Sequence, residues 1–187
     1  SKPKEVFLRH LQQTSKSVTV DQVDLIIWPE NAVDIDINTN NEVKKLINDK
    51  SAILDTPLLV GGVTKSGDNL LNQSFLFDPQ IKQLYAKRYL TPFGEYLPLR
   101  GIATKVSRYA DQITDFKAGQ EDTKFLIDNA TFQSLICYEL LDDSFRDQIN
   151  TNFLVIQTNN ATFGDTAQLD QQLNIARVRA IETGRYI

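Results

Sequence analysis

The sequence predicts an α/β domain with mixed sheets, because amphipathic helical segments alternate with short apolar strands and tight turns join two pairs of strands. Its 187 residues suffice for one sizeable core and are too few for two ordinary domains. Hydrophobic residues make up 41% of the chain and charged residues 24%, which is an ordinary globular composition. We therefore expect a single domain over residues 1–187.

In the first half of the chain, apolar spacing and breaker residues predict two helices and four strands. Helical spacing, with Pro3 in the first turn, favours a helix over residues 3–15. The apolar run 23–28 is typical of a strand buried on both faces, and Pro29 ends it. The other expected elements are a helix at 42–49, a strand at 57–60 that ends at Gly61-Gly62, where close backbone approach is possible, and a hairpin of strands 70–78 and 81–86.

In the second half, residues 88–101 contain several prolines and glycines and predict a structured surface loop. A second hairpin, with strands 124–127 and 131–137, is expected to turn at Asp128-Asn129. A short helix to about residue 149, a strand at 153–157 and a helix at 168–183 with Gly184 as its C-cap complete the elements.

Composition excludes several classes of function. A net charge of -4 and a pI near 5.0 give no basic face, so we expect no nucleic-acid partner. The single cysteine excludes an internal disulfide, and the single histidine, His10, is too little for a multi-histidine metal centre, so we expect no metal and no cofactor. No apolar run approaches the ~18 residues of a membrane span, and the ends of the chain suggest a piece of a longer protein.

Three residues with reactive side chains follow apolar strands directly: Glu30, Lys87 and Cys137. Each alone is most often structural, and a lone cysteine after an apolar run is usually a small buried hydrophobe. Sites in α/β proteins are nevertheless built at strand ends, so the three could converge. Together they would supply a nucleophile, a general base and a cation that lowers the thiol pKa and stabilises an oxyanion.

Longer strings around these residues resemble a known family. Residues 28–32 (WPENA), 87–98 (KRYLTPFGEYLP) and 136–139 (ICYE) look, in this order, like the catalytic segments of the nitrilase superfamily. The continuation TPFGEYLP is most similar to the apolipoprotein N-acyltransferase branch, as are residues 158–165 and 177–185. The resemblance implies a nitrilase-like α-β-β-α sandwich, incomplete at both ends, with the membrane-spanning part absent from this chain.

The resemblance also implies a reaction. Cys137 would attack an ester of a phospholipid acyl donor, with Glu30 as general base and Lys87 and the N–H of Tyr138 holding the oxyanion. The thioester would then pass its acyl chain to the diacylglyceryl-cysteine of an apolipoprotein acceptor. Glu95 and Glu139 match family positions, and we expect them to orient or polarise Lys87. The implied location is the bacterial plasma membrane, with the catalytic domain on the extracytoplasmic face.

Other interpretations stay open at this point. A soluble amidase or nitrilase would use the same three residues with water as the acceptor, and a scaffold that had become a binding domain would use none of them. A Cys-His hydrolase is disfavoured, because His10 lies in the first predicted helix and no strand end surrounds it. Many members of the branch have Asp and Trp where this chain has Asn160 and Thr162, so one wall of the acyl site is expected to differ.

Overall fold

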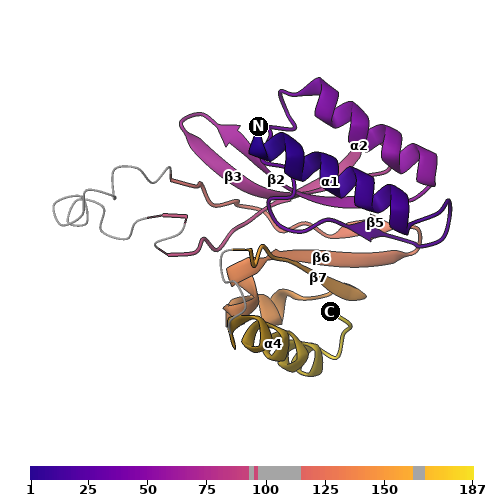
Figure 1. Ribbon diagram of the computed structural model, residues 1–187. Helices are drawn as coiled ribbons and strands as arrows, with labels where there is room; N and C mark the ends of the chain where they lie inside the picture. Colours follow the sequence, from indigo (N-terminus) through magenta and orange to yellow (C-terminus); the bar gives the residue numbers. More distant parts are fainter. Residues whose placement is uncertain (93–94, 97–114, 162–166) are drawn as a thin grey trace.

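The computed structural model describes residues 1–92, 95–96, 115–161 and 167–187. Four layers are visible in Figure 1: α1 and α2 cover one sheet, a second sheet packs against it, and α4 lies outside the second sheet. The predicted α-β-β-α sandwich with mixed sheets is confirmed. The elements are α1 (Lys2–Ser17), β1 (Ile26–Ile27), α2 (Asn41–Leu54), β2 (Leu58–Ser66), β3 (Asn69–Phe77), β4 (Ile81–Ala86), β5 (Phe125–Ile127), β6 (Ala130–Ile136), the 3-10 helices η2 (Cys137–Leu141) and η3 (Asp143–Gln148), β7 (Phe153–Gln157) and α4 (Ala167–Thr183).

The two sheets have different strand directions. In the first, the order is β1-β2-β3-β4, with β1 parallel to β2 and the other pairs antiparallel. In the second, the order is β5-β6-β7, with an antiparallel β5–β6 hairpin and β6 parallel to β7. The C-terminal ends of β1, β4 and β6 each lead directly into one of the segments predicted to carry chemistry.

The alternation of side chains along the strands divides the core in two. In β2, Leu58 and Val60 face the helices, whereas Leu59 faces the second sheet. Along β3, Phe75 faces the helices and Leu76 faces the second sheet. The first core therefore joins α1 and α2 to the first sheet, and the second core joins the two sheets face to face.

Three predicted elements differ from those observed. The strand expected at 23–28 is reduced to β1, and Ile27 is 47% exposed because β1 lies at the edge of its sheet. β2 does not stop at Gly61 and Gly62, which pair with β3 and let the strand run to Ser66. The helix expected at 42–49 extends from 41 to 54: the side chain of Asn40 caps its start by accepting from the Val43 N–H at 3.0 Å, and Asp55, in the left-handed region, ends it.

Most of the other elements are confirmed. The hairpin strands β3–β4 and β5–β6, the strand β7 and the helix α4 lie within a residue or two of their predicted ranges, and Gly184 after α4 has a φ of 62°. Half of the predicted surface loop at 88–101, residues 93–94 and 97–101, lies outside the described residues. In the described ranges, no helix combines the length and apolar character needed to cross a membrane.

Candidate active site

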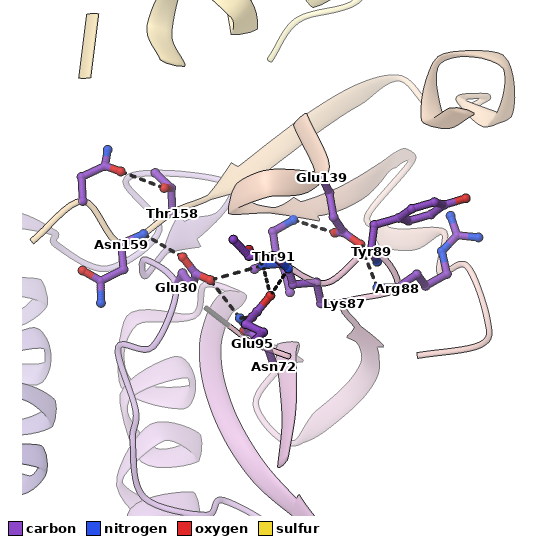
Figure 2. Close-up of polar contacts among 12 residues, drawn as sticks. Glu30, Asn72, Lys87, Arg88, Tyr89, Thr91, Glu95, Glu139, Thr158 and Asn159 are labelled. Carbon is purple, nitrogen blue, oxygen red and sulfur yellow. Dashed lines mark hydrogen bonds and ion pairs between the residues drawn. The ribbon is translucent and has the colours of Figure 1, made fainter. Parts of the chain in front are cut away.

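Glu30 stands at the end of β1, and hydrogen bonds fix both of its carboxylate oxygens. Oε1 accepts from Asn72 Nδ2 at 2.8 Å, and Oε2 accepts from the backbone N–H of Asn159 at 2.9 Å (Figure 2). The residue is only 7% exposed. Because the partners come from β3 and from the segment after β7, both sheets hold this carboxylate in place.

Glycines allow the backbone to approach at two of the strand ends. A Cβ on Gly61 would overlap the carbonyl oxygen of Pro29 and would lie 2.9 Å from the Cα of Glu30. A Cβ on Gly119 would overlap the carbonyl just before Lys87, and the Gly119 N–H donates to the Lys87 carbonyl at 2.8 Å. The expected close approach at Gly61 is thus confirmed, and it places the Glu30 segment directly on β2.

Lys87 is a buried cation with two carboxylates beside it. Its Nζ lies 2.7 Å from Glu95 Oε2 and 3.9 Å from Glu30 Oε1, and it donates to Thr91 Oγ1 at 3.1 Å. The side chain of Lys87 is 1% exposed. Burial acts to raise the pKa of the Glu95 carboxyl, but Lys87 and hydrogen bonds from Asn72 and Thr91 outweigh it, so the pKa is lowered.

Asn72 joins the two carboxylates and was not identified from the sequence. Its Nδ2 group donates to Glu30 Oε1 at 2.8 Å and to Glu95 Oε1 at 3.0 Å, so each amide hydrogen serves one carboxylate. The signal in the sequence was the polar run Asn72-Gln73-Ser74 inside an otherwise apolar strand. All three of these residues are buried, which marks the run as part of an internal polar network.

Cys137 lies at the sharp junction of β6 and η2. It has a φ of 51°, a left-handed conformation that non-glycine residues rarely adopt, and its side chain is half-buried. Burial and the neighbouring Glu30 raise the pKa of the thiol, whereas Lys87 and a hydrogen bond with Thr158 lower it. The net shift is upward. The prediction that Lys87 lowers the thiol pKa gave the right direction for that one contribution, but burial and Glu30 outweigh it.

Glu139 forms a different contact from the one expected. Its carboxylate is fully buried and accepts from the backbone N–H groups of Arg88 and Tyr89, at 2.8 and 3.1 Å, and from the Tyr85 hydroxyl at 2.7 Å. The other oxygen accepts from the Ile136 N–H at 2.8 Å. Glu139 therefore acts on the backbone just after Lys87, not on its ammonium group, and ties this turn to the strand that carries Cys137. Burial raises the pKa of Glu139, while these four donors act in the opposite direction.

Four other residues were named from the sequence: Tyr138, Asn160, Thr162 and His10. Tyr138 is 37% exposed and, with Cys137, lines a mainly apolar cavity of about 240 Å³ between η2 and α4. Asn160 lies in the segment after β7, whereas Thr162 falls outside the described residues. His10 stacks on Trp28 among the residues on the helix side of the first sheet, with ring centroids 5.5 Å apart.

The arrangement has the parts that acyl transfer requires. A thiol stands against a carboxylate that can take its proton, and a buried ammonium group lies 3.9 Å from that carboxylate. Within the described part of the chain, no three His, Cys, Asp or Glu side chains gather in a way that could hold a metal ion.

Known proteins with similar sequences share one name. The chain is 33% identical over 173 residues to an apolipoprotein N-acyltransferase of Mycolicibacterium smegmatis, covering 87% of this chain and 29% of that protein. It is 32% identical over 181 residues to the enzyme of that name from Haemophilus influenzae, covering 88% and 34%. The chain thus spans about a third of the length of these relatives.

A solved structure and a family comparison place the chain more broadly. The fold matches a carbon-nitrogen-hydrolase superfamily protein of Xanthomonas campestris with a TM-score of 0.71 at 17% identity, over 98% of this chain and 68% of that one. The sequence model of the carbon-nitrogen hydrolase family matches residues 3–187. The chain therefore belongs to the carbon-nitrogen hydrolase family.

Proposed function

We propose that this chain is the catalytic domain of an apolipoprotein N-acyltransferase, in which Cys137 is the nucleophile, Glu30 the general base and Lys87 the oxyanion-stabilising cation. The observation that carries the proposal is the convergence of these side chains at the ends of β1, β4 and β6. Relatives that are 32–33% identical in sequence to this chain bear the name of that enzyme. The chain belongs to the carbon-nitrogen hydrolase family. A thiol that attacks a carbonyl carbon would form the covalent intermediate that acyl transfer needs.

The first half-reaction forms a thioester. Glu30 takes the proton of the Cys137 thiol as the sulfur attacks the ester carbonyl of a phospholipid. Lys87 and the backbone N–H of Tyr138 stabilise the negative charge that develops on the carbonyl oxygen. The C–O bond then breaks, the leaving oxygen takes the proton from Glu30, and a lysophospholipid departs. The acyl chain remains on the sulfur, and the apolar cavity beside Cys137 offers it a contact surface.

The second half-reaction transfers the acyl chain to an amine. The free α-amino group of a lipoprotein's diacylglyceryl-cysteine attacks the thioester carbonyl and gives a proton to Glu30. The C–S bond breaks, the amide is released, and the sulfur recovers the proton. Water in place of the amine would hydrolyse the thioester, so the choice of acceptor separates the transferase from an amidase that uses the same residues.

The buried surroundings of Lys87 suit its proposed role in stabilising the oxyanion. An ammonium group that is 1% exposed interacts with a developing oxyanion more strongly than one in water would. Glu95 and Asn72 hold it and its neighbour Glu30 in fixed positions, so little reorganisation is needed during the reaction. For the complete protein, we propose that this site lies at the extracytoplasmic face of the bacterial plasma membrane, since the donor is a phospholipid and the acceptor carries a lipid group.

Mass spectrometry of the full-length protein incubated with phospholipid tests the proposal. We expect an added acyl mass on Cys137 that is lost when a lipopeptide with a free α-amino group is supplied. Glu30→Gln should prevent formation of the adduct, and Cys137→Ala should abolish it.

Two results would count against the transferase. If no acyl adduct formed on Cys137 with any phospholipid, while the protein hydrolysed small amides, the chain would be a hydrolase of the same family. If Cys137→Ala retained acyl transfer, the nucleophile would be another residue. Glu42→Gln, on the exposed start of α2, is a matched carboxylate control and should behave like the wild type.

A further inference from the structure

A ring of three polar side chains lies beside the nucleophile. Thr158 follows β7, and its hydroxyl accepts from Gln172 Nε2 and donates to Asn160 Oδ1, both at 3.0 Å. Asn160 Nδ2 in turn donates to Gln172 Oε1 at 2.9 Å. Each member of this Thr158 ring is thus bonded to both others, and the ring joins the segment after β7 to α4.

The ring is part of the wall around the reacting sulfur. Gln172 and Cys137 line the same cavity of about 240 Å³. Cys137 and Thr158 directly follow Ile136 and Gln157, which are paired across the parallel strands β6 and β7, so the two residues lie side by side, and the Thr158 hydroxyl acts to lower the pKa of the Cys137 thiol. The next residue, Asn159, donates its backbone N–H to Glu30 at 2.9 Å (Figure 2), so the same segment also contacts the proposed base. A substitution in the Thr158 ring is therefore expected to change the ionisation of the Cys137 thiol.

The Thr158 hydroxyl has a single hydrogen and two competing acceptors for it. While Cys137 is a neutral thiol, its S–H group bonds to Glu30, and the Thr158 hydroxyl donates its hydrogen to Asn160 Oδ1. Once the thiol has lost its proton, the sulfur is charged and is the stronger acceptor. Rotation about the Cβ–Oγ1 bond then brings the hydrogen to the sulfur, while the bond from Gln172 to the oxygen need not break.

We propose that Thr158 is a further catalytic residue, whose hydroxyl donates to the Cys137 thiolate, and that Gln172 and Asn160 are positioning residues that hold this hydroxyl in place. The inference rests on the proposed function of Cys137 as the nucleophile. The thiolate occurs twice in the cycle, as it attacks the ester and as it leaves the thioester, so the donor assists both half-reactions. This assigns α4 a part in the chemistry through Gln172.

The charged groups that face the thiol make such a donor useful. Glu30, after β1, raises the thiol pKa in addition to the effect of burial, and Lys87, at the end of β4, opposes it. Lys87 already pairs with Glu95 at 2.7 Å. The Thr158 hydroxyl is a second group that favours the ionised sulfur, and it adds no charge to the site.

The test measures the pH dependence of Cys137 alkylation by iodoacetamide in the full-length protein, followed by mass spectrometry. Thr158→Val removes the donor at constant shape, and we expect it to move the alkylation midpoint upward by about one pH unit, a tenfold loss of thiolate at neutral pH. Thr158→Ser keeps the hydroxyl and should match the wild type. Gln172→Leu should shift the midpoint in the same direction by a smaller amount.

Gln171 provides the matched control, because it lines the same cavity and is the neighbouring residue on α4. Gln171→Leu should leave the midpoint unchanged. An unshifted midpoint in Thr158→Val, or an equal shift in Thr158→Ser, would overturn the inference. Alkylation does not depend on the phospholipid donor, so a wild type that alkylates as expected but forms no acyl adduct would contradict the proposed function and leave standing only the hydrogen bond from Thr158 to the thiolate.

Discussion

Lys87 and Glu95 form a buried ion pair, with 2.7 Å between Nζ and Oε2, whereas the proposed base Glu30 lies 3.9 Å from the same ammonium group. The closer carboxylate is therefore the one that fixes the position of Lys87. Glu30 remains oriented by Asn72 and by the N–H of Asn159. Asn72 links the two carboxylates, because its Nδ2 group donates to both of them.

Glu95→Gln should lower the rate of thioester formation by about 100-fold, because Lys87 loses the charged partner that positions it. The rate of appearance of the acyl adduct on Cys137 measures this loss.

The lowered pKa of Glu95 also predicts how the stability of the fold depends on pH. A carboxyl with a depressed pKa stabilises the fold above its unfolded value, about 4.3, and this contribution is lost as the pH falls through the folded value. The wild type should therefore exceed Glu95→Gln in Tm at pH 7, and the difference should shrink below about pH 4.

Thermal unfolding of both proteins between pH 3 and 7 measures this difference. Glu5→Gln, in the exposed first turn of α1, serves as the control carboxyl. A Tm difference that stayed constant across the range would show that Glu95 does not act through its charge.

Glu30→Gln should make Cys137 easier to alkylate and at the same time stop acyl transfer. Burial is the main cause of the raised thiol pKa, and the negative Glu30 adds to it, so neutralising Glu30 lowers the pH midpoint of alkylation. Lys87→Met should have the opposite effect on the midpoint, since Lys87 favours the thiolate. In all three proteins the alkylation rate should rise with pH as the thiol ionises.

The measurement is the rate of iodoacetamide addition at Cys137 between pH 6 and 10. If Glu30→Gln raised the midpoint, the carboxylate would be acting on the thiol in some way other than through its charge. Parallel losses of alkylation and acyl transfer in that variant would indicate a distorted site.

Glu139→Ala should be among the most destabilising substitutions at this site. It leaves the N–H groups of Arg88, Tyr89 and Ile136 and the Tyr85 hydroxyl without their acceptor in the interior. Each buried donor left without a partner costs about 1–3 kcal/mol, so we expect a loss of at least about 3 kcal/mol in the free energy of unfolding.

Urea denaturation followed by circular dichroism measures that loss. Asp49→Asn removes an exposed carboxylate from an i,i+4 pair with Lys45 and should change stability by less than about 0.5 kcal/mol. Equal effects of the two substitutions would mean that the four bonds to Glu139 contribute little.

The positions of Glu30, Lys87 and Cys137 directly after apolar strands predicted that they could converge, and the resemblance of the strings around them to the nitrilase superfamily is what singled out these three. Glu30, Lys87 and Cys137 are indeed placed together. The contacts that hold them could not be predicted in the same way. Asn72 lies 42 residues from Glu30 and Asn159 lies 129 residues from it, and only the folded sheets bring such residues together.

The hydrogen bonds of the buried Gln157 side chain could not be predicted from the sequence either. Gln157 ends an apolar strand, and its Nε2 donates to the Trp28 carbonyl at 2.7 Å, while its Oε1 accepts from Ser74 and Ser134. These contacts join both sheets just before Glu30. The strand pattern predicted where Gln157 would lie along the chain, but its partners depend on how the two sheets are packed against each other. The direction of the Glu139 contacts was missed for the same reason.

Gly61→Ala should displace the segment that carries Glu30. The new Cβ would overlap the carbonyl oxygen of Pro29 and lie 2.9 Å from the Cα of Glu30, and these are backbone atoms that cannot turn aside. We expect a loss of about 2 kcal/mol or more in stability and a large fall in thioester formation. Gly62→Ala is the matched control in the same strand, because its nearest neighbour is the end of a side chain, Ile37 Cδ1 at 3.2 Å. Urea denaturation and the acyl-adduct assay measure both effects, and a Gly61→Ala protein as stable and as active as Gly62→Ala would show that close packing of β2 on Pro29 is not what positions the base.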